Sequence, residues 1–111
     1  MLDDGATDHF QVVDCLRCAG ALKPDVIFFG ENVPPGRVAD CYALVGAARM
    51  LLVLGSSLTV MSGYRFVRHA AKLGIPVVII NQGATRGDAQ ATLILDAPLG
   101  PTLAALATGC R

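Results

Sequence analysis

Two short, wholly apolar runs in the middle of the sequence restrict what the chain can fold into. Residues 50–55 (MLLVLG) and 76–80 (PVVII) carry no polar side chain and are typical of buried strands. Between them, residues 64–73 place apolar side chains on one face and basic ones on the other, as an amphipathic helix does. Strand, helix and strand within about thirty residues predict a βαβ unit. We expect a parallel sheet covered on both faces, with a right-handed crossover.

Further elements are predicted on both sides of this unit. The β-rich run at residues 26–29 (VIFF) predicts a buried strand. Residues 37–48 predict a helix, and Cys41 lies on its apolar stripe, so we expect this cysteine to be buried, as free cysteines usually are. Residues 92–95 (TLIL) predict another strand, and a short helix is expected from near Pro101. The apolar stripe of the first helix consists of Val38, Cys41, Tyr42 and Val45.

Small polar residues follow the two central strands. Residues 55–57 (GSS), within a predicted loop at 56–63, come after the first strand, and residues 81–83 (NQG) come after the second. Ligands bind beyond the carboxyl ends of parallel strands, so these segments form a candidate ligand site. Gly55 lets a ligand approach the backbone, and the Asn81 amide can hold a ribose hydroxyl. The same residue types are also typical of ordinary turns. No glycine-rich dinucleotide fingerprint or Walker loop occurs in the sequence.

Cys15 and Cys18 have the spacing of half a structural zinc site. Zinc in such a site takes four ligands, and the sequence holds no second Cys-x-x-Cys and no His-x-x-x-His. Two unligated thiols in a turn are one alternative. A redox dithiol is another, although that motif usually opens a helix, which the following residues do not resemble. His69 lies on the polar face of its predicted helix, and we expect it to be solvated.

Composition narrows the class of partner. Apolar residues make up 53% of the 111 residues and the formal net charge is zero, which suits one folded domain or part of one. No basic stripe points to nucleic acid, and no apolar run reaches the ~20 residues of a membrane helix. The acidic first residues lack an apolar signal segment. We therefore expect a cytoplasmic protein without a disulfide framework.

Three motifs in series resemble one protein family. The run CLRCAGALKPDVIFFGE at residues 15–31, then GSSLTVMSG at 55–63, then IINQGATRGD at 79–88 is similar to the C-terminal half of a sirtuin, from about residue 14 to residue 106. Sirtuins are NAD-dependent protein lysine deacylases. The VMSGYRF stretch at residues 60–66 and the TRGD loop at residues 85–88 look most like the class II branch of the family.

The resemblance implies roles for particular residues. It implies that Gly55, Ser56 and Ser57 touch the ribose and phosphate side of NAD, that Asn81 binds the adenine ribose, and that the Leu99 backbone meets the adenine. An acyl-lysine peptide would lie as an added strand between Gly30–Glu31 and the segment around Val60. Residues bordering the acyl-lysine tunnel would be Val26 and Phe28.

The resemblance also gives the cysteine pair a role. Cys15 and Cys18 match the second of the family's two zinc-binding pairs, and the first pair would lie upstream. The family's catalytic histidine, its Gly-Ala-Gly-x-Ser loop and its Gln-Asn-x-Asp motif would lie upstream as well, and His9 does not replace the histidine. Two departures occur, since Ala19 stands where the family has glycine and Val13 where it has proline. If position 19 needs a positive φ, alanine costs about 1 kcal/mol there.

We therefore expect an α/β fold: the C-terminal part of a Rossmann-like parallel sheet with helices, plus half of a small zinc-binding module. About residues 1–25 would be the half zinc module and lead-in, and about 26–111 the NAD-binding portion. The chain would be inactive alone, and its incomplete sheet would promote self-association. The alternatives are a non-catalytic α/β nucleotide- or partner-binding module, and an assembly subunit that shares zinc between copies.

Overall fold

A computed structural model describes residues 11, 13–22, 24–28 and 30–110. The chain divides into two units, Met1–Val33 and Pro34–Arg111, and each is considered by itself. The predicted boundary near residue 25, between the half zinc module and the NAD-binding portion, stays a prediction. Among the described residues, no helix is both long enough and apolar enough to cross a membrane.

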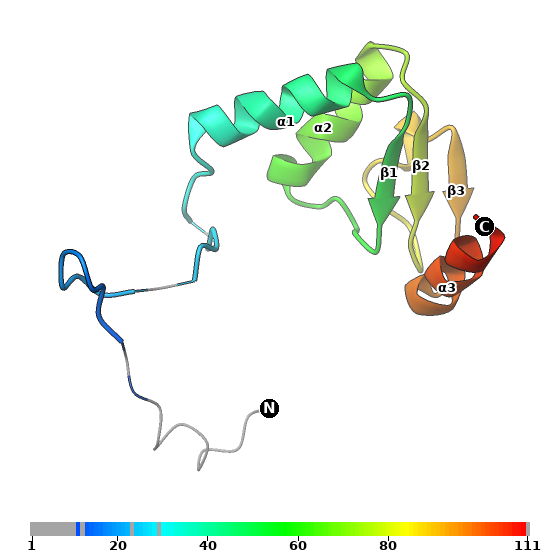
Figure 1. The fold of residues 1–111 in the computed structure, drawn as a ribbon. Helices are drawn as coiled ribbons and strands as arrows, with labels where there is room; N and C mark the ends of the chain where they lie inside the picture. Colours follow the sequence, from blue (N-terminus) through cyan, green and yellow to red (C-terminus); the bar gives the residue numbers. More distant parts are fainter. Residues whose placement is uncertain (1–10, 12, 23, 29, 111) are drawn as a thin grey trace. The chain divides into compact units, whose positions relative to one another are not determined.

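The second unit is built on a three-stranded parallel sheet (Figure 1). Strands β1 (Leu51–Leu54), β2 (Val77–Ile80) and β3 (Leu93–Leu95) lie in the order β1-β2-β3. In one row of the register, Leu52 pairs with Val78 and Val78 pairs with Leu93. The predicted parallel arrangement of the apolar runs is therefore confirmed.

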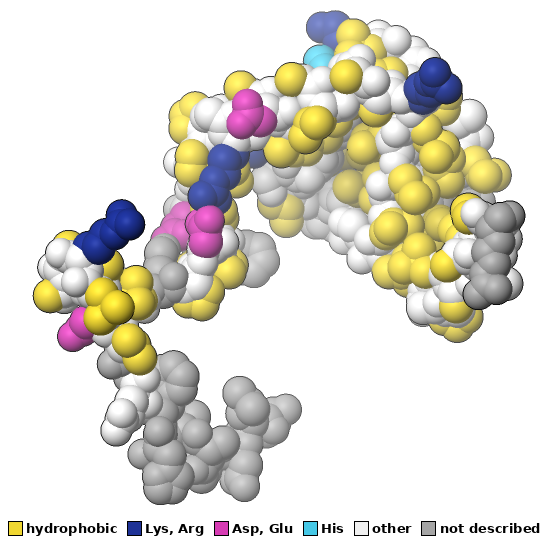
Figure 2. All heavy atoms as spheres, in the orientation of Figure 1, with side chains coloured by type: hydrophobic (Ala, Val, Ile, Leu, Met, Phe, Trp, Pro, Cys, Tyr) yellow, Lys and Arg dark blue, Asp and Glu magenta, His cyan; other side chains and the backbone are white. Residues whose placement is uncertain are grey.

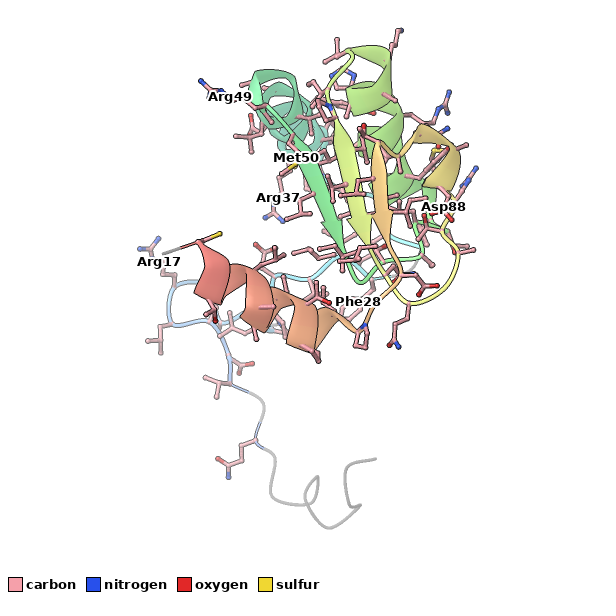
Figure 3. All side chains as sticks on the ribbon, turned by 90° about the vertical axis from the view of Figure 1, so that its right-hand side faces the viewer. Arg17, Phe28, Arg37, Arg49, Met50 and Asp88 are labelled. Atoms are coloured by element: carbon pink, nitrogen blue, oxygen red, sulfur yellow. The ribbon has the colours of Figure 1, made fainter. Side chains whose placement is uncertain are left out.

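Helices connect and flank these strands. Helix α1 spans Pro35–Ala47, α2 spans Met61–Lys72, the short 3-10 helix η2 spans Asp88–Gln90, and α3 spans Leu99–Gly109. Helices α1 and α2 lie on one side of the sheet, whereas α3 lies beyond the carboxyl ends of the strands (Figures 1 and 3).

The bounds of two helices differ from those predicted. Residues 61–63, expected in a loop, form the first turn of α2, because the Val60 carbonyl accepts hydrogen bonds from the N–H groups of Gly63 (3.2 Å) and Tyr64 (3.1 Å). Helix α3 begins two residues before Pro101, a residue tolerated in a first turn, where its missing N–H has no helical partner anyway. Helix α2 is followed by Gly74 at φ +74°, as predicted.

The core lies between the sheet and the helices on one side. Alternate residues of β1 and β2 point toward this side, and β2 is the best-covered strand. The core residues are Val45, Leu58, Tyr64, Val67, Ala70, Val77 and Ile79, with Leu51 and Val53 packed against them. The expectation that the strands are covered on both faces is wrong for the described residues. On the opposite face, Leu52, Leu54, Leu93 and Leu95 are exposed whereas Ile80 is buried, and Figure 2 shows hydrophobic side chains gathered over the sheet.

Two further expectations are wrong. Cys41 is exposed, because α1 packs chiefly against α2 and buries only a narrow stripe that includes Val45. Residues 26–28 are not a strand. A strand needs a neighbour to pair its N–H and C=O groups, whereas here the Val26 N–H donates locally to the Pro24 carbonyl (2.8 Å). Residue 29 lies outside the described residues.

Candidate functional site

The carboxyl ends of β1 and β2 meet at one edge of the sheet. Leu54 pairs with Ile80, and the chain continues from them into Gly55 and Asn81. The Gly55 N–H donates to the Ile80 carbonyl (2.8 Å), and the Asn81 N–H donates to the Leu95 carbonyl (3.1 Å). Neighbouring strands lie about 4.8 Å apart, so the two residues follow adjacent strands at the same edge, as the topological argument predicts.

Gly55 is required where it stands for two reasons. Its φ of +60° lies in the left-handed region that favours glycine. A Cβ at this position would lie 2.8 Å from the Leu99 Cδ2 atom, closer than van der Waals contact allows. The half-buried Leu99 side chain, at the start of α3, therefore rests on the Gly55 backbone. The structure brings together Gly55, predicted at a ligand site from the strand topology, and Leu99, assigned to the cofactor only by family resemblance.

The loop after β1 is fixed by its own hydrogen bonds. The Ser56 Oγ accepts from the Leu58 N–H (3.2 Å), and the hydroxyls of Ser57 and Thr59 are hydrogen-bonded (2.8 Å). Leu58 has a positive φ of +57°, which is uncommon for a residue with a bulky side chain. This conformation directs the Leu58 side chain into the core, where 6% of its surface is exposed, while Ser56 and Ser57 stay exposed.

The loop after β2 is shaped by its first residue. The Asn81 Nδ2 donates to the carbonyls of Gln82 (3.1 Å) and Gly83 (3.3 Å). The Gly83 N–H donates to the Asp96 Oδ1 (3.1 Å), which ties the loop to the end of β3. Because the Asn81 nitrogen shapes the turn, a ligand hydroxyl at this edge would meet Asn81 through its side-chain oxygen.

Arg86 links the two loops, and the sequence reasoning missed this role. Its N–H donates to the Ser57 carbonyl (2.9 Å), and its Nη1 donates to the Thr59 carbonyl (3.1 Å). The guanidinium also lies 4.5 Å from the centroid of the Tyr64 ring, a cation–π distance. A lone arginine in a polar loop gives no sequence signal for these contacts.

Asp88 holds the same loop from the other end. Its carboxylate accepts hydrogen bonds from the Thr85 hydroxyl and the Thr85 N–H. These bonds, the hydroxyl first, favour the ionised form and hold the pKa of the Asp88 carboxyl below its usual value. The ionised Asp88 carboxylate, labelled in Figure 3, therefore holds Thr85 and stabilises the turn at residues 85–88.

Cys15 and Cys18 lie in a tight knuckle in the first unit. The Cys15 N–H donates to the Gly20 carbonyl (2.8 Å), the Ala19 N–H donates to the Cys15 carbonyl (2.9 Å), and residues 14 and 21 form an antiparallel bridge. The Arg17 N–H donates to the Cys15 Sγ (3.4 Å). Hydrogen bonds from the Arg17 and Cys18 backbone, and then from the Cys18 side chain, lower the pKa of the Cys15 thiol.

Two features of the knuckle matter for the binding of zinc. Ala19 has φ +57°, so the position where the family has glycine does need a positive φ, and the predicted cost of about 1 kcal/mol applies. N–H groups directed at a sulfur favour a thiolate, which is the form that binds zinc. Within the described part of the chain, no group of three or more histidine, cysteine, aspartate or glutamate side chains could hold a metal ion.

The predicted peptide segments lie in different units. In the first unit, the Phe28 N–H donates to the Glu31 Oε2 (3.1 Å) and the Glu31 N–H donates to the Phe28 carbonyl (3.0 Å), around Gly30 at φ +87°. Val26 and Phe28 are exposed. In the second unit, Val60 is exposed and extended just before α2. The predicted peptide cleft between these segments stays a prediction.

Comparisons with known proteins agree with the motifs. Residues 4–62, more than half of the chain, match the family described as the Sir2 family. The NAD-dependent protein deacetylase 1 of Streptomyces coelicolor is 59% identical over 106 residues, and that of Mycobacterium avium is 57% identical over 101 residues. These alignments cover 96% and 91% of this chain and 36% of each relative. The chain thus spans about a third of the length of these curated relatives.

Solved structures are similar as well. A structure described as Sir2 bound to acetylated peptide has a TM-score of 0.76 and 28% identity, over 93% of this chain and 43% of that one. A structure described as Sir2 with a p53 peptide and NAD+ also has a TM-score of 0.76 and 28% identity, over 96% of this chain and 45% of that one.

Proposed function

The chain belongs to the Sir2 family, and on that premise we propose that it forms part of an NAD-dependent protein deacetylase. The observation that carries this proposal is the meeting of Gly55, Asn81 and Leu99 at one edge of a parallel sheet. The two bacterial relatives support the proposed reaction, because both are called NAD-dependent protein deacetylases. The segment would be the Rossmann-like portion of a cytoplasmic enzyme, and its class II character remains a prediction.

The cofactor assignment is supported by the shape of the sheet edge. Gly55 presents backbone without a side chain, Ser56 and Ser57 present exposed hydroxyls, and Asn81 presents an amide oxygen. These groups fit a sugar and phosphate, which need a close backbone approach and hydrogen-bonding partners. The backbone at Leu99, in the first turn of α3, would meet the adenine. NAD bound here would supply the ADP-ribose that accepts the acyl group.

The acyl-lysine peptide would bind along exposed backbone. Val60 is extended, with φ −85° and ψ 132°, a conformation suited to pairing with an added strand. Gly30 and Glu31 are proposed to contact the same peptide, and Val26 and Phe28 are proposed to border the acyl group. The exposure of Val26 and Phe28 supports a role in contact with another chain.

Zinc is proposed as a structural ion held by Cys15 and Cys18 together with two ligands outside this chain's 111 residues. The lowered pKa of the Cys15 thiol and the tight knuckle support two preorganised thiolate ligands. The described residues supply only half of the tetrahedral set that structural zinc requires. An ion at this site would bind weakly until the other pair is present.

The decisive experiment places this chain in a complete enzyme. The matching third of the Streptomyces coelicolor deacetylase is replaced by residues 1–111, and NAD-dependent deacetylation of an acetyl-lysine peptide is measured. Asn81→Ala removes a hydrogen bond worth about 1–3 kcal/mol. We expect the Michaelis constant for NAD to rise roughly 5- to 150-fold, and that for peptide to change much less.

Gln82→Ala is the matched control, because Gln82 is exposed in the same loop and receives no cofactor role. An Asn81→Ala chimera with an unchanged NAD requirement would contradict the assignment of the site. A chimera that folds but is inactive would contradict the proposal that this chain forms part of a deacetylase. The 111-residue chain alone is expected to show no turnover, because a missing general base alone costs ~10²–10⁴ in rate.

A further inference from the structure

A basic cleft opens on the helical side of the second unit. Its volume is about 470 Å³, and it is lined by one residue of α1, four of α2 and one of η2: Tyr42, Arg65, Arg68, His69, Lys72 and Gln90. Helix α2 runs back along the sheet from the carboxyl edge toward the start of β2. Three of the four lining residues of α2, Arg68, His69 and Lys72, are in its second half, which therefore lies away from Gly55 and Asn81. In Figure 2, basic side chains lie near the histidine at this end of the helices.

The basic side chains of the cleft form one continuous stripe. Residues 65, 68, 69 and 72 have the spacing i, i+3, i+4 and i+7, so they share one face of α2. Like charges at this spacing destabilise a helix. The helix dipole accounts for basic residues in the last turn, which are His69 and Lys72. It does not account for Arg65 and Arg68, which lie earlier.

The nearby acidic residues do not neutralise this stripe. Asp40 lies two residues before Tyr42 on α1, which places it on nearly the opposite side of that helix. The Asp88 carboxylate is occupied by Thr85. Within the described ranges, no carboxylate forms an ion pair with Arg65, Arg68 or Lys72. The cleft therefore has an uncompensated positive charge.

The floor of the cleft offers aromatic and polar contacts. The Tyr42 ring lies edge-on to His69, with centroids 4.8 Å apart. The Gln90 Nε2 donates to the Tyr64 hydroxyl (2.8 Å), while the Gln90 Oε1 is buried and has no hydrogen-bond partner. The Tyr64 hydroxyl can accept from an amide or donate to one. In either orientation of the Gln90 amide, one buried polar atom is left for a partner from outside the chain.

We propose that this cleft binds the phosphate groups of a phosphorylated small molecule. Arg65, Arg68 and Lys72 hold the phosphate oxygens, since guanidinium and ammonium groups are the usual partners of phosphate. The half-buried Gln90 side chain, whose Oε1 has no hydrogen-bond partner within the described residues, makes a hydrogen bond to a polar group of the same ligand. The volume lies within the range of small-molecule sites, about 300–1,000 Å³. The proposal does not depend on the proposed deacetylase function.

The test uses the 111-residue chain and tripolyphosphate, titrated by calorimetry at low salt. The double variant Arg68→Glu, Lys72→Glu reverses two charges of the cleft. We expect saturable binding to the unaltered chain, at least about tenfold weaker binding to this variant, and weaker binding to both at high salt.

Two further variants separate the cleft from general charge and from misfolding. Arg17→Glu, Arg49→Glu makes the same change in net charge at exposed arginines outside the cleft, labelled in Figure 3, and should retain binding. Arg68→Lys, Lys72→Arg keeps both charges and should also retain binding. The proposal is overturned if the unaltered chain shows no saturable binding, or if the Arg17 and Arg49 variant loses binding to the same extent as the cleft variant.

Discussion

The exposed face of the sheet should make the isolated chain self-associate. Leu52 and Leu93 flank Val78 in one row of the sheet, and Leu54 and Leu95 flank Ile80 in the next. The four leucines are between 38% and 58% exposed. Their exposed surface is close to that of two fully exposed leucines, so covering it is worth about 3–6 kcal/mol per chain.

The balance of these terms predicts weak association. A symmetric contact between two such faces gains about 6–12 kcal/mol, whereas association costs an estimated 4–15 kcal/mol. We therefore expect dissociation constants in the micromolar to millimolar range. Leu52→Lys with Leu93→Lys removes a little over half of the exposed leucine surface and places charges in the contact. This variant should weaken association by at least about a hundredfold.

Sedimentation equilibrium from about 10 to about 500 µM covers the expected constants. The matched control is Leu44→Lys with Leu73→Lys, two exposed leucines on the helical side of the unit. The control should associate as the unaltered chain does. An unaltered chain that stays monomeric throughout this range refutes the reasoning, and so does a control that loses association equally.

Three smaller predictions follow from single contacts. Gly87→Ala should lower the free energy of unfolding by about 1–3 kcal/mol, because its Cβ would lie 2.7 Å from a carbon of the buried Leu58 side chain. Gly36→Ala is the control and should not lower it, because the space around Gly36 is open. Hydrogen exchange measures the stability of both variants. The Asp88 carboxyl should titrate by NMR at a lower pH than the carboxyl of an unstructured aspartate peptide, because its pKa is lowered; its contribution to stability is present above the unfolded pKa and lost as the pH falls through the lower folded pKa. Cys15 should react with iodoacetamide at a lower pH than an unstructured cysteine peptide does, because its pKa is lowered; equal pH profiles would contradict this.

The sequence predicted the central elements well because their patterns are unambiguous. The two apolar runs became β1 and β2, shortened by one or two residues, and the charged face of residues 64–73 marked α2. The meeting of Gly55 and Asn81 followed from strand order alone. These features depend on local patterns and on the geometry that all parallel sheets share.

The errors occur where a residue's surroundings decide its state. Cys41 lies four residues before Val45, on the same face of the helix, but it is exposed. The periodicity of apolar residues predicts which face of a helix is buried, but not how much of that face is in contact with its neighbours. The run at 26–28 has strand composition but does not form a strand, and the Val26 N–H donates to the nearby Pro24 carbonyl instead. His69, expected in solvent, is half-buried against Tyr42. The positive φ of Leu58 has no sequence signal, since leucine rarely adopts it.

The order of the strands has a consequence for how the chain is made. Each strand pairs with the one that follows it, so the two pairings close loops of about 25 and about 15 residues, whose entropy cost differs by less than ~1 kcal/mol. The β1–β2 pair needs no later segment before it can form, and β3 adds to an existing edge. At roughly 5–20 residues per second of synthesis, the sheet can grow on the ribosome one strand at a time, always onto the strand made last.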